Sequence, residues 1–160
     1  MPGSWPPHEL PHLTFDTCEI TSPRSRRYNC IAWAAGTNDK WWWPDPQGLY
    51  FWPDGVPREE TVDAFMQAYA TCGYQLCLNS SLREELEKIA LFGIKTADGS
   101  TLPTHAALQL ESGEWTSKLG TLEDIRHKTD DAVNGPLYGK VVCYMSRPRN
   151  ALRSIGAHKG

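Results

Sequence analysis

The sequence lacks several features that would place it in a large functional class. None of its apolar runs approaches the roughly 18 residues that a membrane-spanning helix needs. Residues 1–11 have neither a basic start nor an apolar stretch, so we expect no secretory signal there. The net charge is −3, which leaves no basic surplus to neutralise phosphates. We therefore expect no membrane and no nucleic acid as partners. One basic cluster, formed by Arg24, Arg26 and Arg27, is either a solvated loop or a contact for an acidic group.

Metal and nucleotide motifs are missing as well. The chain has five cysteines, but no CxxC pair and no Cys/His cluster with zinc-binding spacing. The odd number leaves at least one cysteine unpaired within the chain, which favours a reducing, cytoplasmic setting. Export without a cleaved signal peptide, as an effector, is the alternative. No glycine-rich phosphate loop follows a predicted strand. We expect no metal and no cofactor.

The length of 160 residues and the hydrophobic content of 40% indicate one domain with a sizeable core. Residues 1–27 are rich in proline and polar side chains without a sustained period, which predicts an extended N-terminal arm. The domain proper is expected over residues 28–146. Residues 147–160 are expected to form a loose C-terminal tail.

Two helices are expected before a set of strands. Asn29 is a typical helix cap and Gly36 a typical helix stop, so the segment between them is a short helix. Residues 40–57 are crowded with aromatics and prolines and are expected to be irregular. Pro57 then opens a helix that ends at Gly73. Strands are expected over 74–78, 88–94, 102–110, 114–119 and 137–145, with loop and a short helix over 122–134. This order predicts an α+β fold.

Cys30 is the candidate nucleophile. Thiol catalysis needs a thiolate, a base that generates it and a group that orients the base. Cys30 lies in the first turn of the expected helix, where unsatisfied backbone N–H groups lower the pKa of a thiol and can bind an oxyanion. The helix continues in small side chains, which allow it to pack closely on a sheet that carries the base. The alternative is a buried structural cysteine.

His105 is the candidate base, because it opens a strand far downstream of Cys30 and has small neighbours. The alternative is a capped surface or core histidine. The strand leads into a hairpin whose register decides which side chain lies beside His105. A three-residue loop places Ser117 there, and a two- or four-residue loop places Thr116 and Lys118 there. Asp124 is a further candidate for orienting the base.

The stretch NCIAWAAG at 29–36 resembles the cysteine-bearing helix of papain-like thiol hydrolases. A narrower resemblance, to a bacterial family, combines this stretch with WWWP, PREETVDAF, THAA, WTSKLG and DIxH, at 41–44, 57–65, 104–107, 115–120 and 124–127. The resemblance covers about residues 25–145. It implies a papain-like fold, in which an N-terminal helix carrying Cys packs on an antiparallel β-sheet carrying His, with Cys30 and His105 as the catalytic dyad.

Other side chains are candidates for support and for substrate binding. Asn29 is either an oxyanion donor or a plain helix cap. Lys118 and Asp124 are expected to support the site. His127 is either a second functional histidine or a satisfied loop residue. The substrate-binding candidates are aromatic, with core packing as the alternative: Trp33, Trp42 and Trp43.

Together these features predict a cysteine-dependent hydrolase, a peptidase or amidase, that acts on a protein or peptide through a Cys30–His105 dyad with Ser117. One alternative is a bacterial toxin or effector that uses the same chemistry to cleave or deamidate a target protein and is neutralised by an immunity protein. Another is a non-catalytic binding module with an aromatic recognition loop at 41–52. A glycosidase is poorly supported, because the acidic residues of 123–131 lie in polar surroundings.

Overall fold

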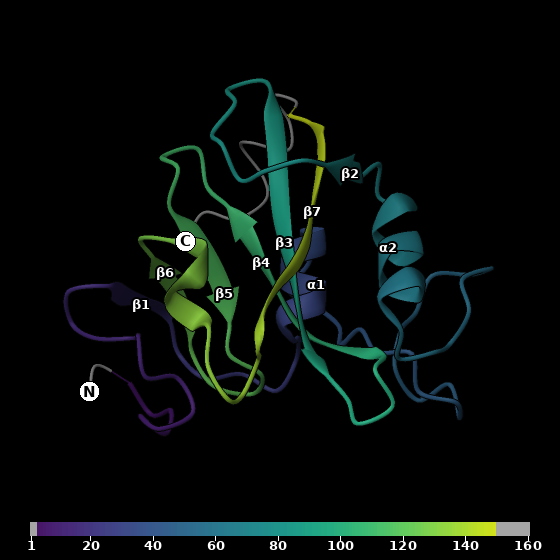
Figure 1. Ribbon diagram of the computed structural model, residues 1–160, viewed down its shortest axis with the longest axis horizontal. Coiled ribbons are helices and arrows are strands. Elements are labelled where there is room, and N and C mark those ends of the chain that lie inside the picture. The colour runs from purple at the N-terminus through teal and green to yellow at the C-terminus, as the bar shows by residue number, and fades with distance from the viewer. Residues whose placement is uncertain (1–2, 150–160) are drawn as a thin grey trace.

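A single antiparallel sheet of seven strands dominates the computed structural model, which describes residues 3–149 (Figure 1). The strands lie in the order β1-β6-β5-β4-β3-β7-β2. Their bounds are β1 Cys18–Ser22, β2 Gln75–Cys77, β3 Leu86–Lys95, β4 Thr101–Gln109, β5 Trp115–Lys118, β6 Asp124–His127 and β7 Lys140–Pro148. The helices are α1 Cys30–Ala35, α2 Val62–Ala70 and the 3₁₀ turn η1 Asp130–Val133.

The predicted fold class, α+β with a papain-like arrangement, is wrong. The first element of the chain is strand β1, not a helix, and α1 and α2 have only six and nine residues. Helix α2 begins at Val62 and not at Pro57, because the side chain of Thr61 caps it by accepting a hydrogen bond from Ala64 N–H. The molecule is mostly antiparallel β-structure.

Helix α1 forms where the sequence predicted it. The side chain of Asn29 accepts a hydrogen bond from Ala32 N–H at 3.2 Å and caps the first turn. Gly36 ends the helix in the left-handed region, with φ of 99°, and its N–H donates to the Trp33 carbonyl. All six residues of α1 are buried, and the helix lies against β4 and β5. Its alanines allow this close approach to the sheet.

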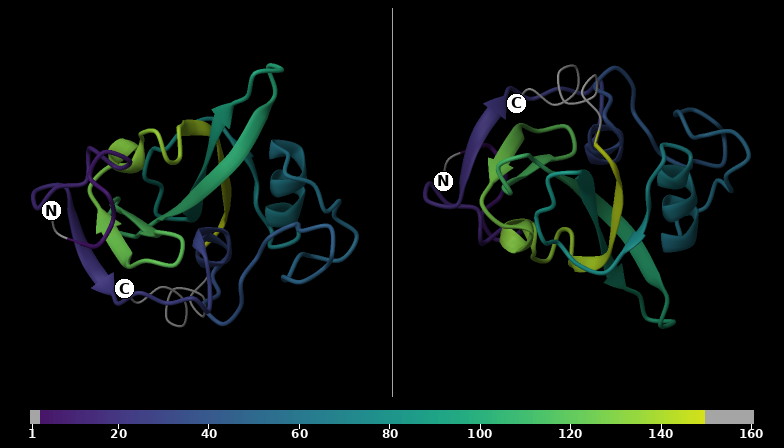
Figure 2. Two further views of the ribbon diagram at one scale, coloured as in Figure 1. Left: turned by 90° about the horizontal axis from the view of Figure 1, so that it is seen from below. Right: turned by 90° about the horizontal axis from the view of Figure 1, so that it is seen from above.

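Two hydrophobic cores cover the sheet, one on each face. Alternation along β3 and β4 assigns neighbouring residues to opposite faces. Ala106 and Leu108 pack in the core that contains α1 and α2, whereas Ala107 packs in the other core. That second core includes η1 and the N-terminal segment, with buried Trp5, Leu10 and Leu13. In Figure 2 the N-terminal segment and α2 lie on opposite sides of the molecule.

The expected N-terminal arm is part of the domain. Residues 18–22 form β1, which pairs antiparallel with β6, and Trp5 is fully buried. Strand β6 lies in the stretch 122–134, for which sequence reasoning expected only loop and a short helix. At the other end, β7 extends to Pro148 and Arg147 is buried, so the domain includes the first residues of the expected tail. Residues 150–160 of that tail lie outside the described residues.

Between residues 3 and 149, no helix combines the length and the apolar character that crossing a bilayer requires.

Candidate functional site

Cys30 is the first residue of α1 and only 5% exposed. Burial raises the pKa of its thiol to about 11, although backbone N–H groups, that of Ala106 foremost, and the Lys118 ammonium act in the opposite direction. The thiol is therefore protonated near neutral pH. Its closeness to the Ala106 N–H places the sulfur beside the peptide unit that joins Ala106 to His105.

His105 lies in the middle of β4 and is fully buried. Its ring stacks on Tyr138 with centroids 4.0 Å apart and meets Phe92 edge-on at 5.3 Å. Burial, with a smaller contribution from His127, holds the pKa of His105 well below its usual value of 6.5. The ring is therefore a neutral imidazole at physiological pH.

A chain of hydrogen bonds fixes the tautomer of His105, and it starts at His127. Nδ1 of His127 lies 2.7 Å from the Thr129 carbonyl oxygen. A carbonyl oxygen only accepts, so this nitrogen carries the hydrogen. Burial lowers the pKa of His127 to about 4, which keeps its Nε2 unprotonated near neutral pH. That Nε2 therefore accepts the hydrogen of the Ser117 hydroxyl, at 2.8 Å.

The same hydroxyl oxygen lies 2.9 Å from Nε2 of His105. Since Ser117 has already donated its one hydrogen, it accepts here, and Nε2 of His105 carries a hydrogen. The neutral ring then has its lone pair on Nδ1. Within residues 3–149 this nitrogen is buried and has no hydrogen-bond partner. The network thus holds an unprotonated ring nitrogen free to accept a proton.

Cys30 and His105 approach the sheet from different faces at a place where it opens. Alternation along β4 places the His105 ring on the face of Phe92 and Tyr138, whereas Ala106 faces α1. The pairing of β4 with β5 covers only Leu108 with Thr116 and Gln109 with Trp115, so β5 does not pair with β4 at Ala106. The Cys30 thiol lies at this opening, beside the Ala106 N–H. No hydrogen bond joins the thiol to Nδ1 of His105.

Ser117 is the side chain that hydrogen-bonds to His105, which is the outcome that a three-residue hairpin loop would give among the alternatives the sequence left open. The pairing of Leu108 with Thr116 places Ser117 on the His105 face. Lys118 and Asp124 point the other way and do not contact His105. The Lys118 ammonium donates to the Ser25 and Gly120 carbonyls.

Asp124 forms its own buried contact, because its carboxylate accepts the Tyr28 hydroxyl hydrogen at 2.5 Å. Burial raises the pKa of this carboxyl, while the Tyr28 hydrogen bond and Lys118 lower it. Lys118 also lies over the Tyr28 ring at 5.0 Å. Lys118 thus lies within electrostatic range of Cys30, and Asp124 is its partner across β5 and β6.

Asn29 forms the helix cap that was the alternative to a role as oxyanion donor. Besides capping α1, its amide donates to the Trp42 carbonyl at 2.7 Å and its side-chain oxygen accepts from Trp42 N–H at 3.1 Å. These bonds attach the aromatic loop to the start of α1. The side chain therefore caps α1 and holds the aromatic loop against it.

Two of the three tryptophans predicted to bind substrate belong to the core. Trp33 is 7% exposed and donates its indole N–H to the Thr116 hydroxyl at 3.0 Å. Trp42 is 6% exposed and packs against Phe51. Neither presents an open ring face, so core packing, the alternative to substrate binding, describes both. Trp43 is half-buried, with its ring edge-on to Phe65.

Sequence reasoning left His127 open and missed Tyr138. The signal for His127 was the DIxH motif, but its role depends on β6, which brings it beside Ser117. Tyr138 lies in a segment without a catalytic motif, and only the fold places its ring on His105. In the part of the chain that the structure describes, no three metal-ligating side chains form a group that could hold an ion.

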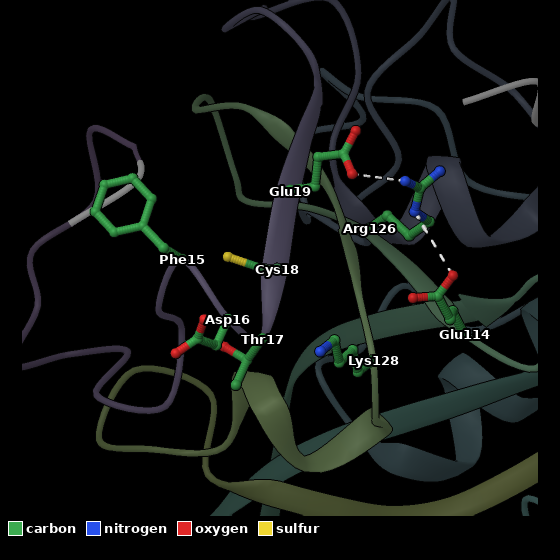
Figure 3. Close-up of a pocket in the computed structure, with 8 residues that line it drawn as sticks. All are labelled: Phe15, Asp16, Thr17, Cys18, Glu19, Glu114, Arg126 and Lys128. Atoms are coloured by element: carbon green, nitrogen blue, oxygen red, sulfur yellow. Dashed lines mark hydrogen bonds and ion pairs between the residues drawn. The ribbon is translucent and has the colours of Figure 1, made fainter.

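A separate pocket of about 250 Å³ lies at the β1 edge of the sheet (Figure 3). Its Arg126 guanidinium is paired with Glu19 at 2.7 Å and faces Glu114 at 3.7 Å. Its one thiol, Cys18, has a pKa raised by burial. The lining contains none of the catalytic candidates, and we assign no reaction to it.

A family model described as Domain of unknown function (DUF7689) matches residues 19–146. Comparison with curated proteins and with solved structures found no match in either. The matched stretch begins in β1 and ends in β7, and it contains Cys30, His105, Ser117 and His127. The chain belongs to the DUF7689 family.

Proposed function

We propose that the protein is a cysteine-dependent hydrolase, a peptidase or amidase, with Cys30 as nucleophile and His105 as its base. The observation that carries the proposal is Nδ1 of His105, which is buried, unprotonated and without a hydrogen-bond partner among the residues that the structure describes. A buried polar atom that is left unsatisfied costs about 1–3 kcal/mol, so a residue kept in this state calls for an explanation. A role as general base explains why this nitrogen has no hydrogen-bond partner among the described residues.

The resting site holds a neutral pair and not an ion pair. The pKa of Cys30 is raised and that of His105 is lowered, so the proton stays on sulfur until a substrate reacts. Catalysis then resembles that of a serine hydrolase, in which the base removes the proton as the nucleophile attacks. Ser117 and His127 keep the His105 ring in the tautomer that this step requires.

The proposed reaction passes through a thioester on Cys30. The Cys30 sulfur attacks the substrate carbonyl carbon while its proton passes to Nδ1 of His105. The resulting imidazolium gives that proton to the departing amine or ammonia, and a thioester remains. His105 then removes a proton from water as the water oxygen attacks the thioester carbon, the C–S bond breaks, and the imidazolium returns the proton to the Cys30 sulfur. The products are a carboxylic acid and the free Cys30 thiol.

Cys143 provides a matched control for testing the nucleophile. Burial also raises the pKa of this thiol to about 11, but it lies on β7, away from His105. We expect the wild type and Cys143→Ala to cleave a proteome-derived peptide library or to release ammonia from it. Cys30→Ala and His105→Ala should do neither, while their melting temperatures show that they are folded.

Mass spectrometry of new peptide termini, with an enzymatic ammonia assay, measures both reactions. Turnover that persists in Cys30→Ala would refute the assignment of the nucleophile. A wild type that produces neither new termini nor ammonia would contradict the proposal as a whole.

A further inference from the structure

The basic cluster at residues 24–27 lines a pocket that the proposed reaction leaves unexplained. The pocket has a volume of about 350 Å³ and is lined by Arg24, Ser25, Arg26, Thr121 and Leu122. Two arginines, two hydroxyl-bearing residues and one leucine thus line the space, and among residues 3–149 no acidic residue lines it. Such a set of donors suits an anionic group on a small or flexible ligand.

Within the described residues, no acidic side chain neutralises either arginine of the pocket. Among residues 3–149, Arg24 and Arg26 take part in no ion pair. Arg27 differs, because the Asp39 carboxylate is its electrostatic neighbour. The acidic residue next to the pocket, Glu123, has its carboxylate engaged by the Ser4 hydroxyl at 2.8 Å. Two positive charges therefore remain available to a ligand.

Lys118 connects this pocket with the candidate catalytic site. Its ammonium is buried and donates to the carbonyl of Ser25 on one wall and to that of Gly120, next to Thr121, on the other. The same ammonium interacts electrostatically with the Cys30 thiol. One side chain thus joins both walls of the pocket and lies within electrostatic range of the nucleophile.

From this arrangement we infer that the Arg24–Arg26 pocket is a substrate subsite for an acidic side chain, Asp or Glu, of the peptide on which Cys30 acts. The inference rests on the proposed hydrolase function, which it deepens by naming a substrate preference. Arg24 and Arg26 bind the carboxylate, and Leu122 contacts the aliphatic part of the side chain. Because Lys118 fixes the pocket walls, an acidic residue bound there holds the neighbouring peptide bond near Cys30.

The test uses two libraries of otherwise randomised peptides, one with Glu and one with Gln at a fixed central position. The wild type should cleave the Glu library about threefold to tenfold faster, the range expected for one or two partly exposed charge-assisted contacts. The double variant Arg24→Gln/Arg26→Gln should cleave both libraries at the slower rate. Arg83→Gln, which removes an exposed arginine elsewhere on the surface, should behave as the wild type does.

A binding measurement separates this inference from the proposed function. Retention of both libraries on immobilised Cys30→Ala protein does not require turnover. Preferential retention of the Glu library, lost in the triple variant with both arginines changed, supports the subsite even if no library is cleaved. Equal retention of the two libraries overturns the inference even if Cys30 is the nucleophile. Release of the Glu library by inorganic phosphate at equal concentration also overturns it, because the pocket would then be a general anion site.

Discussion

Acidification should destabilise this domain strongly, because it buries two neutral histidines. The pKa of His127 is about 4 in the folded chain against 6.5 for the ordinary group. A histidine with a lowered pKa binds protons more readily in the unfolded state. Its contribution to stability is therefore complete above pH 6.5 and is lost as the pH falls toward 4. At about 1.4 kcal/mol per pKa unit, His127 alone costs about 2 kcal/mol by pH 5 and about 3 kcal/mol by pH 4.

His105 adds to this loss with the same sign, since burial lowers its pKa as well. The total stability of a domain of this size is about 5–15 kcal/mol, so the effect is a large share. Asp124 acts in the opposite direction. Its pKa is raised by burial, so its carboxyl is more readily protonated in the folded state, and acidification through that pKa favours folding.

Urea unfolding followed by tryptophan fluorescence between pH 7 and pH 4.5 measures this dependence. A His127→Gln variant isolates the histidine contribution from that of Asp124. It should be less stable than the wild type at pH 7, but its free energy of unfolding should fall less with pH by about 2 kcal/mol. His8→Gln, at an exposed position, serves as control and should keep the wild-type slope. A free energy of unfolding that is the same at pH 7 and pH 4.5, or a full slope in His127→Gln, would refute the reasoning.

Three further predictions concern the thiol, the hydrogen-bond chain and α1. Native Cys30 should react with iodoacetamide roughly a hundredfold more slowly than Cys30 in urea, because the pKa of the native thiol is about 11 against the ordinary 9.0. Peptide mapping measures both rates, and equal rates would contradict the burial of the thiol. Ser117→Ala should lower kcat about tenfold to a hundredfold, whereas Ser117→Thr, which keeps the hydroxyl, should have a kcat near that of the wild type. Equal turnover in all three proteins would exclude the orienting role. Gly36→Ala should destabilise the domain by about 1 kcal/mol in chemical denaturation, because φ is 99° at this position and an alanine is strained in that left-handed conformation. An unchanged midpoint would count against that backbone conformation.

Local signals in the sequence were sufficient for some elements and insufficient for others. The caps at Asn29 and Gly36 located α1 correctly, because both act within one turn of the helix. Pro57 was a misleading start for α2, since the capping hydroxyl of Thr61 decides where the helix begins. Strand β6, Asp124–His127, carries no apolar alternation of its own and forms because β1 and β5 pair with it on either side.

The candidate site likewise has features that local sequence signals could predict and features that depend on the fold. A hairpin loop of three residues places Ser117 beside His105, and that outcome was among those the sequence offered. The sequence left Trp33 and Trp42 open between core packing and a cleft, because the large ring of tryptophan suits either place. The tautomer of His105 depends on Ser117, His127 and the Thr129 carbonyl together. No local pattern in the sequence specifies such a network.

The proposed mechanism requires Nδ1 of His105 to be an unprotonated acceptor for the Cys30 proton. Long-range ¹H–¹⁵N correlation NMR at pH 7 reads the tautomer of each histidine ring directly. We predict that His105 is neutral with its hydrogen on Nε2, and that His127 is neutral with its hydrogen on Nδ1. A hydrogen on Nδ1 of His105 would contradict the account, because that nitrogen could not then receive a proton from the thiol.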